Sequence, residues 1–170
     1  MYSVGDQLVY GTNGVCKVNE IRNSPFDAAD TRQFYVLSPL ENNSNLMIYT
    51  PAEGGNTVMR DLVSKEEAEA LLARIPQIEA VEVPFEKKRR DVYRETVSTA
   101  RLEDFVRIIK TVAKRRADFK KSRRRLPDLD NDYEHTARIC LYGEISAVLG
   151  LDRDEVNSRV NALLETSAQA

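Results

Sequence analysis

The sequence predicts an α+β fold, in which a small antiparallel β-barrel or curled sheet precedes an all-α helical domain. Up to about residue 63, short runs rich in Val, Tyr, Ile and Phe alternate with turns that contain Gly, Pro or Asn. From Ser64 onward, apolar residues recur at helical spacing, and capping residues stand at the segment ends. The predicted units are residues 1–63 (the barrel), 64–83 (a helix and a linker) and 84–170 (the helical domain).

The first unit contains five segments with the composition of strands. These strands are expected at residues 6–11, 14–21, 32–40, 45–51 and 57–63. Asn13-Gly14 favours a hairpin turn between the first two strands, because both residues tolerate positive φ. Short strands at this spacing are typical of a small twisted barrel.

Residues 64–170 show a helical pattern with one interruption. Helices are expected at residues 64–76, 86–97, 100–119, 131–149 and 153–165. Between Pro76 and Pro84 the chain reads as an extended linker. Gly150 is placed to end the fourth helix in the left-handed conformation.

Polar side chains at three helix starts predict N-terminal caps. Ser64 and Glu67 have the spacing of a capping box, in which each side chain bonds the backbone amide of the other. Asp152 and Glu155 form a second such pair, and Asp130 is placed to cap the helix that starts at residue 131.

The composition excludes several classes of protein. The chain of 170 residues is 42% hydrophobic, which suffices for a core and argues against disorder. No apolar run approaches the roughly 20 residues that span a bilayer, and the first residues lack a signal core, so we expect no export and no membrane partner. Cys16 and Cys140 form no CxxC pair, and we expect both to be reduced and partly buried.

Charge is segregated along the chain. Residues 1–83 hold 6 Lys/Arg and 12 Asp/Glu, residues 84–125 hold 16 and 6, and residues 126–170 hold 3 and 9. The formal net charge of −2 therefore conceals a central segment of net charge +10. Such a segment attracts polyanions whatever the average of the chain.

No set of residues predicts an enzyme, a metal site or a cofactor. His135 is the single histidine, and it stands in a polar first helical turn with no marked pocket or orienting partner. Asp128, Asp130, Asp132 and Glu134 alternate, but the central glycine and terminal glutamate of a calcium loop are missing, so helix capping explains them better.

The central basic segment predicts contact with nucleic-acid phosphates. Lys87, Arg90 and Arg94 share one helix face, and Arg107, Lys110 and Lys114 are expected to repeat that stripe on the next helix. A solvated face paired with the chain's own acidic tail is the simpler alternative. The candidate DNA-binding residues are Phe85, Lys87, Lys88, Arg89, Arg90, Arg94, Lys120, Lys121, Arg123, Arg124 and Arg125. Phe85 is either an apolar wedge between base steps or a linker residue packed on the helices.

The stretch VGDQLVYGTNGVCKVNEI resembles the opening of the CarD/CdnL family, whose N-terminal module is shared with the transcription–repair coupling factor. FYVLSPL, MIYTPAE, MRDLVSKEEAEALL and, in the helical part, ARICLYGEIS are also similar to the family pattern. The order and spacing of these motifs carry the resemblance, which spans almost the whole chain.

The resemblance implies a Tudor-like or SH3-like barrel that docks on the bacterial RNA polymerase β subunit, largely by sheet-edge pairing. It also implies a helical module that lies on double-stranded promoter DNA, without strong sequence specificity, and stabilises the open complex. The expected polymerase-binding residues are Arg22, Leu46, Met47, Ile48, Tyr49, Thr50, Pro51 and Arg60. Tyr49 stands where family members carry an arginine, and the family's minor-groove tryptophan falls near Phe85 or Glu86.

The expected protein is thus a cytoplasmic, nucleoid-associated transcription regulator, a monomer without enzymatic activity, metal or cofactor. The alternative is a protein–protein adaptor whose basic helices dock an acidic partner instead of DNA.

Overall fold

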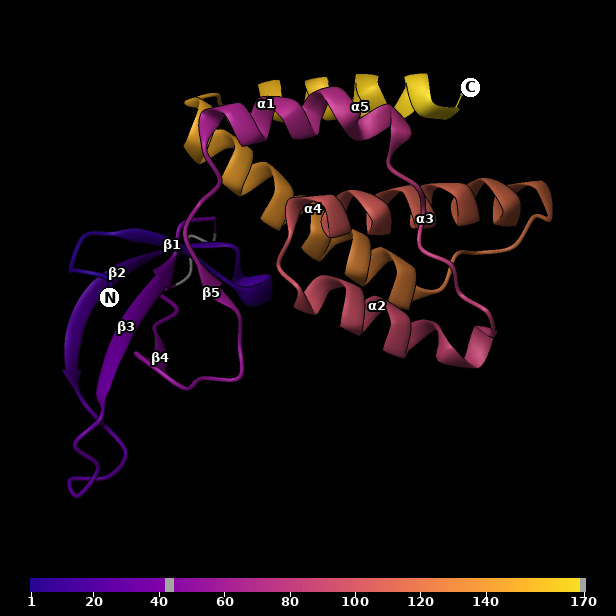
Figure 1. Ribbon diagram of the computed structural model, residues 1–170. Helices are drawn as coiled ribbons and strands as arrows, with labels where there is room; N and C mark the ends of the chain where they lie inside the picture. The colour runs from indigo at the N-terminus through magenta and orange to yellow at the C-terminus, as the bar shows by residue number, and fades with distance from the viewer. Residues whose placement is uncertain (42–44, 169–170) are drawn as a thin grey trace.

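The N-terminal module is a five-stranded antiparallel sheet, as the sequence predicts (Figure 1). The computed structural model describes residues 1–41 and 45–168. The strands are β1 (Gln7–Tyr10), β2 (Val15–Asn23), β3 (Gln33–Pro39), β4 (Ile48–Pro51) and β5 (Met59–Arg60). Their order in the sheet is β4-β3-β2-β1-β5, so β4 and β5 are its two edges.

The hairpin between β1 and β2 is present, but its turn differs from the predicted Asn13-Gly14 turn. Residues Gly11–Asn13 form a single 3-10 turn (η1), and the positive φ values fall on Gly11 (51°) and Gly14 (70°). A Cβ on Gly11 would lie 2.5 Å from Cγ2 of Thr57, so this position needs glycine for space as well as for φ.

The helical module contains α1 (Lys65–Arg74), η2 (Ile75–Gln77), η3 (Glu86–Lys88), α2 (Arg89–Ser98), α3 (Leu102–Lys121), α4 (Asp128–Leu149) and α5 (Arg153–Ala168). The predicted capping box of Ser64 and Glu67 is present. So is the reciprocal pair of Asp152 and Glu155, and Gly150 ends α4 in the left-handed conformation. Among the described residues, none of the helices is long and apolar enough to cross a membrane.

The expected cap by Asp130 is wrong. The helix α4 begins at Asp128, three residues earlier than a cap at Asp130 requires, and among the described residues no side chain caps its first turn. Asp130 is instead fully buried, where it accepts hydrogen bonds from the Tyr93 hydroxyl (2.7 Å) and from Nε of Arg115 (3.2 Å). The side chain therefore joins α2, α3 and α4, a function that a local pattern does not reveal.

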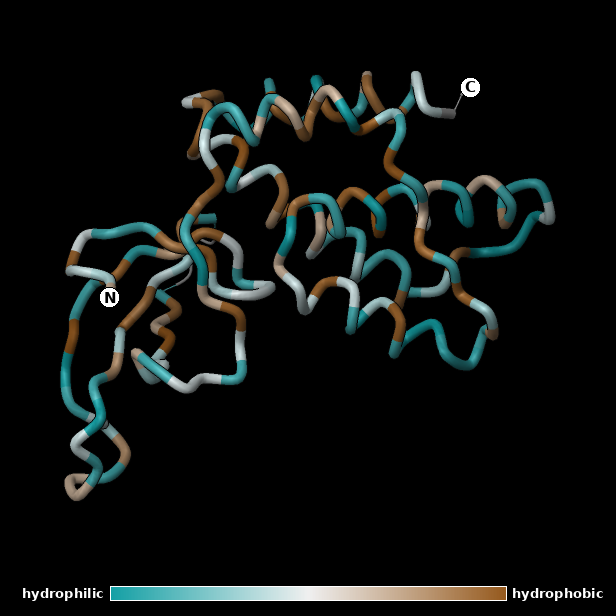
Figure 2. The backbone as a smooth tube through the Cα atoms, viewed as in Figure 1, coloured by the Kyte–Doolittle hydropathy of each residue, from teal (hydrophilic) through white to brown (hydrophobic). Residues whose placement is uncertain are grey.

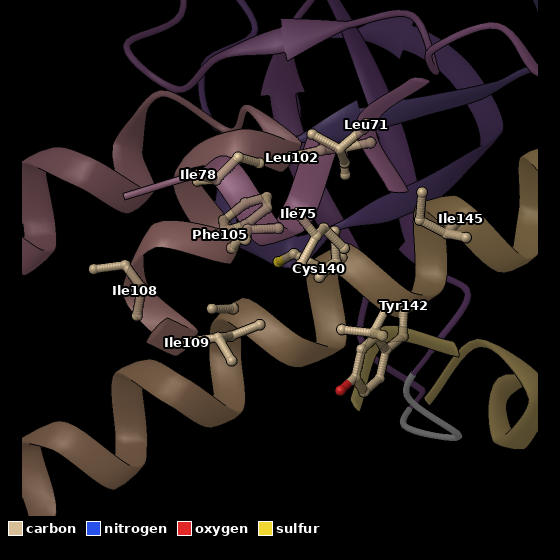
Figure 3. Close-up of a cluster of buried hydrophobic side chains, with 14 of the residues drawn as sticks. Leu71, Ile75, Ile78, Leu102, Phe105, Ile108, Ile109, Cys140, Tyr142 and Ile145 are labelled. Carbon is tan, nitrogen blue, oxygen red and sulfur yellow. The ribbon is translucent and has the colours of Figure 1, made fainter. Parts of the chain in front are cut away.

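Two apolar clusters hold the molecule together. The larger cluster lies among the helices and includes Phe105, Ile109 and Ile145 (Figure 3), and the smaller one lies inside the sheet. Figure 2 shows hydrophobic residues (brown) alternating with hydrophilic ones (teal) along the helices. Burying one such side chain contributes about 1.5 to 3 kcal/mol. The buried faces of α1 and η2 belong to the larger cluster, so residues 64–78 pack as part of the helical module.

The two modules are in direct contact. Val9 of β1 belongs to the helical cluster, and the thiol of Cys140 on α4 donates to the carbonyl oxygen of Thr12. Glu144 on α4 accepts two hydrogen bonds from Arg60 on β5 and one from the amide of Val63 (2.9 Å). The sheet is therefore fixed against the helices by an apolar contact and by a buried ion pair.

Both cysteines are free and buried, as expected. Burial raises the pKa of each thiol to about 12. Because the thiolate is the reactive form, we expect neither cysteine of the native protein to react with iodoacetamide at pH 8, whereas both react in denaturant. Intact-mass spectrometry after a timed reaction measures this difference. Rapid single alkylation of the native protein would contradict it.

Candidate functional site

Most of the predicted contact residues fall into two places. One is the edge of the sheet at β4, and the other is the end of the helical module at which α2 starts and α3 ends (Figure 1). We call these places the β4 edge (residues 46–51) and the basic end (residues 85–90 and 114–125). In Figure 1 the basic end lies on the side of the helices away from the sheet.

The β4 edge offers unpaired backbone groups. Within residues 1–41 and 45–168, strand β4 pairs with β3 alone, and the amide of Ala52 donates a hydrogen bond to the carbonyl oxygen of Gln33. Since hydrogen-bonded residues alternate along an antiparallel strand, Thr50 and Ile48 also bond inward. The N–H and C=O groups of Tyr49 consequently face away from the sheet, where a further strand can pair with them.

The side chains of the β4 edge also alternate, between exposed and buried positions. Tyr49 is 42% exposed, and Leu46 and Met47 just before the strand are exposed as well. Thr50 is buried and accepts a hydrogen bond from the Tyr10 hydroxyl (3.1 Å). Of the predicted polymerase-binding residues, Leu46, Met47 and Tyr49 are therefore accessible as side chains, and Thr50 is not.

Arg22 and Arg60 were predicted for the same surface, and the structure separates them. Arg22 lies exposed on β2, 3.9 Å from a carboxylate oxygen of Glu20. Arg60 is part of the contact between the modules, with a side chain 24% exposed and bonded to Glu144 and to the carbonyl oxygens of Ala100 and Asp61. Every guanidinium nitrogen of Arg60 donates a hydrogen bond within the chain, so this side chain supports the contact between the modules and is not offered to a partner.

The basic end is assembled around one carboxylate. Glu86 in η3 accepts hydrogen bonds from Arg89 (3.1 Å) and from Arg115 on α3 (2.5 Å). These bonds hold the start of α2 against the second half of α3, and they lower the pKa of Glu86, which stays ionised at neutral pH. Phe85, next to Glu86, is 64% exposed, which contradicts the alternative that it packs on the helices.

Several of the predicted DNA-binding arginines form ion pairs within the chain. Arg89 bonds Glu86 and the Tyr93 hydroxyl and is mostly buried. Arg94 pairs with Asp91, and Arg125 pairs with Asp128, both within one helical turn or less and in contact with solvent. Such exposed pairs are weak and separate readily, whereas Arg89 is held in place.

The expected basic stripe along α3 is present only in part: Lys114 is exposed, but Lys110 and Arg107 are held by contacts within the chain. Lys110 donates to the carbonyl oxygens of Ile75 and Ile78 and to the Ser167 hydroxyl, so it joins α3 to η2 and α5. Arg107 pairs with the buried Asp104. Burial raises the pKa of Asp104, but hydrogen bonds from Thr99, Arg101 and Arg107 outweigh this effect and lower it overall.

Nine of the 16 central bases make no salt bridge within the described parts of the chain, and Lys110 is one of the nine. Of the 16 Lys/Arg residues between positions 84 and 125, eight make neither a salt bridge nor the backbone contacts of Lys110 within the described parts of the chain. These free bases are Lys87, Lys88, Arg90, Lys114, Lys120, Lys121, Arg123 and Arg124. All eight are exposed, and all lie at the basic end.

The acidic residues of α4 do not neutralise the eight free bases. Glu134 is buried and accepts hydrogen bonds from Arg116 and Arg138. Burial raises the pKa of Glu134, yet the two guanidinium groups lower it on balance. His135 beside it is exposed, and the described residues contain no cluster that could hold a metal ion.

A family model for the CarD-like/TRCF RID domain matches residues 2–63, which is the whole sheet module. No curated protein matches the chain. The matched residues include both edges of the sheet, Arg22 and Arg60, and they end one residue before the capping box of α1. The helical module, and with it the basic end, lies outside the match.

Proposed function

Because residues 2–63 form a CarD-like/TRCF RID domain, which is a non-catalytic domain that interacts with RNA polymerase, we propose that this protein regulates bacterial transcription by joining polymerase to DNA. The sheet module binds the polymerase β subunit through the β4 edge. The basic end binds promoter DNA and modulates the stability of the open complex. Such a protein acts in the cytoplasm, at the nucleoid.

The open edge of the sheet is the observation that carries the polymerase half of this proposal. The outward N–H and C=O groups of Tyr49 allow a strand of the partner to continue the sheet. Pro51 has no N–H, so the donor for such pairing comes from Tyr49 and from the residues before it. The exposed side chains of Leu46, Met47 and Tyr49 supply apolar contact area.

The DNA half rests on the free bases at the basic end. Eight exposed bases on two segments that Glu86 holds together can follow a phosphate backbone. Contacts of this kind position a protein on a duplex and do not specify its sequence. Phe85 projects from the same end, next to Lys87 and Lys88, where an exposed ring can enter the minor groove between base steps.

Changing Tyr49 to Asp tests the β4 edge. We expect the Kd for the isolated polymerase β subunit to rise about tenfold or more, because a charge at the centre of an apolar interface loses hydration without a partner. Tyr49→Phe is the matched control and should bind normally, since it keeps the ring and the backbone. Biolayer interferometry measures both. Unchanged binding of Tyr49→Asp would contradict the choice of edge.

A further inference from the structure

The loop between β2 and β3 presents an aromatic side chain that the sequence did not single out. Phe26 is 74% exposed, more than any other aromatic residue in the described parts of the chain. Its ring packs edge-on against Phe34 on β3 (centroids 6.0 Å apart) and against Tyr49 on β4 (6.2 Å). The exposed ring of Phe26 therefore adds the loop between β2 and β3 to the apolar surface at the β4 edge.

Phe26 covers the outer face of the sheet. Tyr35 and Leu37 of β3 point into the cluster inside the sheet, so Phe34 and Val36 point to the opposite face. Phe34 and Val36 are nevertheless buried, and neither belongs to the two apolar clusters. The outer face therefore carries a separate apolar layer, with Phe26 and Tyr49 on its surface.

The loop is held in place by its own hydrogen bonds. The Ser24 hydroxyl accepts from the amides of Phe26 (3.3 Å) and Asp27 (3.4 Å), and Asp27 in turn accepts from the amide of Ala29 (2.8 Å). Arg32 binds both oxygens of the Asp30 carboxylate. A ring that is already positioned loses little conformational entropy on binding, which favours its use as a contact residue.

The surroundings of Phe26 have the arrangement of a protein interface. Phe26 and Tyr49 form an apolar centre that is continuous with the β4 edge. The ion pairs Arg32–Asp30 and Arg22–Glu20 lie at its border. Binding energy typically concentrates in the aromatic centre of such a surface, while the polar border excludes water and fixes the orientation.

We propose that Phe26 is an anchor residue that inserts into an apolar pocket of the polymerase β subunit, beside the strand that pairs with β4. This inference rests on the proposed function and adds a contact to it. The anchor makes the interface wider than the pair formed by β4 and the polymerase strand. It also fixes the register between these two strands, because the ring of Phe26 enters its pocket in only one register.

The change Phe26→Ser, tested in the full chain, measures the contribution of this ring. We expect the Kd of Phe26→Ser for the β subunit to rise about tenfold or more, and the Kd of Phe26→Leu to lie between those of the wild-type protein and Phe26→Ser. Val4→Ser is the control, since Val4 is also exposed (60%) but belongs neither to the β4 edge nor to the loop between β2 and β3, so this change should leave the Kd unchanged. Circular dichroism establishes that each variant is folded.

The outcomes separate this inference from the proposed function. If Phe26→Ser binds normally while Tyr49→Asp does not, the anchor is refuted and the β4 edge stands. If both bind normally, the proposed polymerase contact fails as well. If Phe26→Ser abolishes a dimer of the full chain in sedimentation and leaves binding to the β subunit intact, the ring serves a second copy and the inference is overturned.

Discussion

Replacing Glu144 with alanine is expected to lower the free energy of unfolding by about 3 to 5 kcal/mol. The carboxylate is 1% exposed and neutralises Arg60, which is itself largely removed from water. The substitution leaves the guanidinium group without a counter-charge and the amide of Val63 without its acceptor. Urea denaturation followed by circular dichroism measures the change.

A double-mutant cycle tests whether the unpaired charge of Arg60 causes this loss of stability. Glu144→Leu combined with Arg60→Met removes both charges, and we expect the pair to be far more stable than Glu144→Leu alone, because apolar residues of similar volume replace buried ion pairs at little cost. Glu67→Ala, which removes an exposed capping carboxylate, should cost only about 1 kcal/mol. Equal effects of Glu144→Ala and Glu67→Ala would show that the ion pair does not hold the modules together.

Reversing the charge of Lys120, Lys121 and Arg123 is expected to abolish DNA binding at physiological salt without changing the fold. None of the three is paired within the described residues, so their replacement with Glu removes no ion pair or side-chain hydrogen bond. If each base neutralises one phosphate, the slope of log K against log salt becomes smaller by about 2.7. Fluorescence anisotropy of a labelled duplex at several salt concentrations gives this slope.

The matched control reverses three bases elsewhere. Lys65, Arg74 and Arg159 are exposed and lie on α1 and α5, so their replacement with Glu changes the net charge of the chain by the same amount. We expect this control to retain most of its affinity. Equal loss in both variants would show that total charge, and not the basic end, attracts the DNA.

Local chemistry was sufficient to predict much of the fold. The capping box at Ser64 and the left-handed Gly150 involve residues within one turn of each other, and the sequence pattern therefore contains all the relevant information. The sheet likewise follows from short apolar segments and turn residues. The turn between β1 and β2 differs from the prediction, and the close approach of Thr57 to Gly11 in it is a tertiary contact that the local sequence does not reveal.

Long-range electrostatics could not be predicted from the sequence. Glu144 lies 84 residues from Arg60, and Asp130 lies 37 residues from Tyr93, so neither pair has a local signature. For the same reason Lys110 was assigned to a solvent-facing stripe, although it joins three elements of the helical module. A count of charges identified the basic segment correctly but not which bases remain free.

Charge segregation has two consequences in this structure. Part of the basic segment serves the fold, since Arg115 and Arg116 neutralise the buried Asp130 and Glu134. The other part forms the exposed basic end. The protein–protein adaptor remains the competing function, and DNA binding at the basic end is the property that distinguishes a regulator from it.

The most direct test of the account is capture of a duplex by immobilised polymerase β subunit. We predict that wild-type protein retains labelled DNA on the β subunit, and that the Lys120, Lys121 and Arg123 charge-reversal variant binds the β subunit normally but retains no DNA. Retention of DNA by that variant, or failure of the wild-type protein to retain any, would contradict the claim that one chain joins polymerase to DNA through opposite ends.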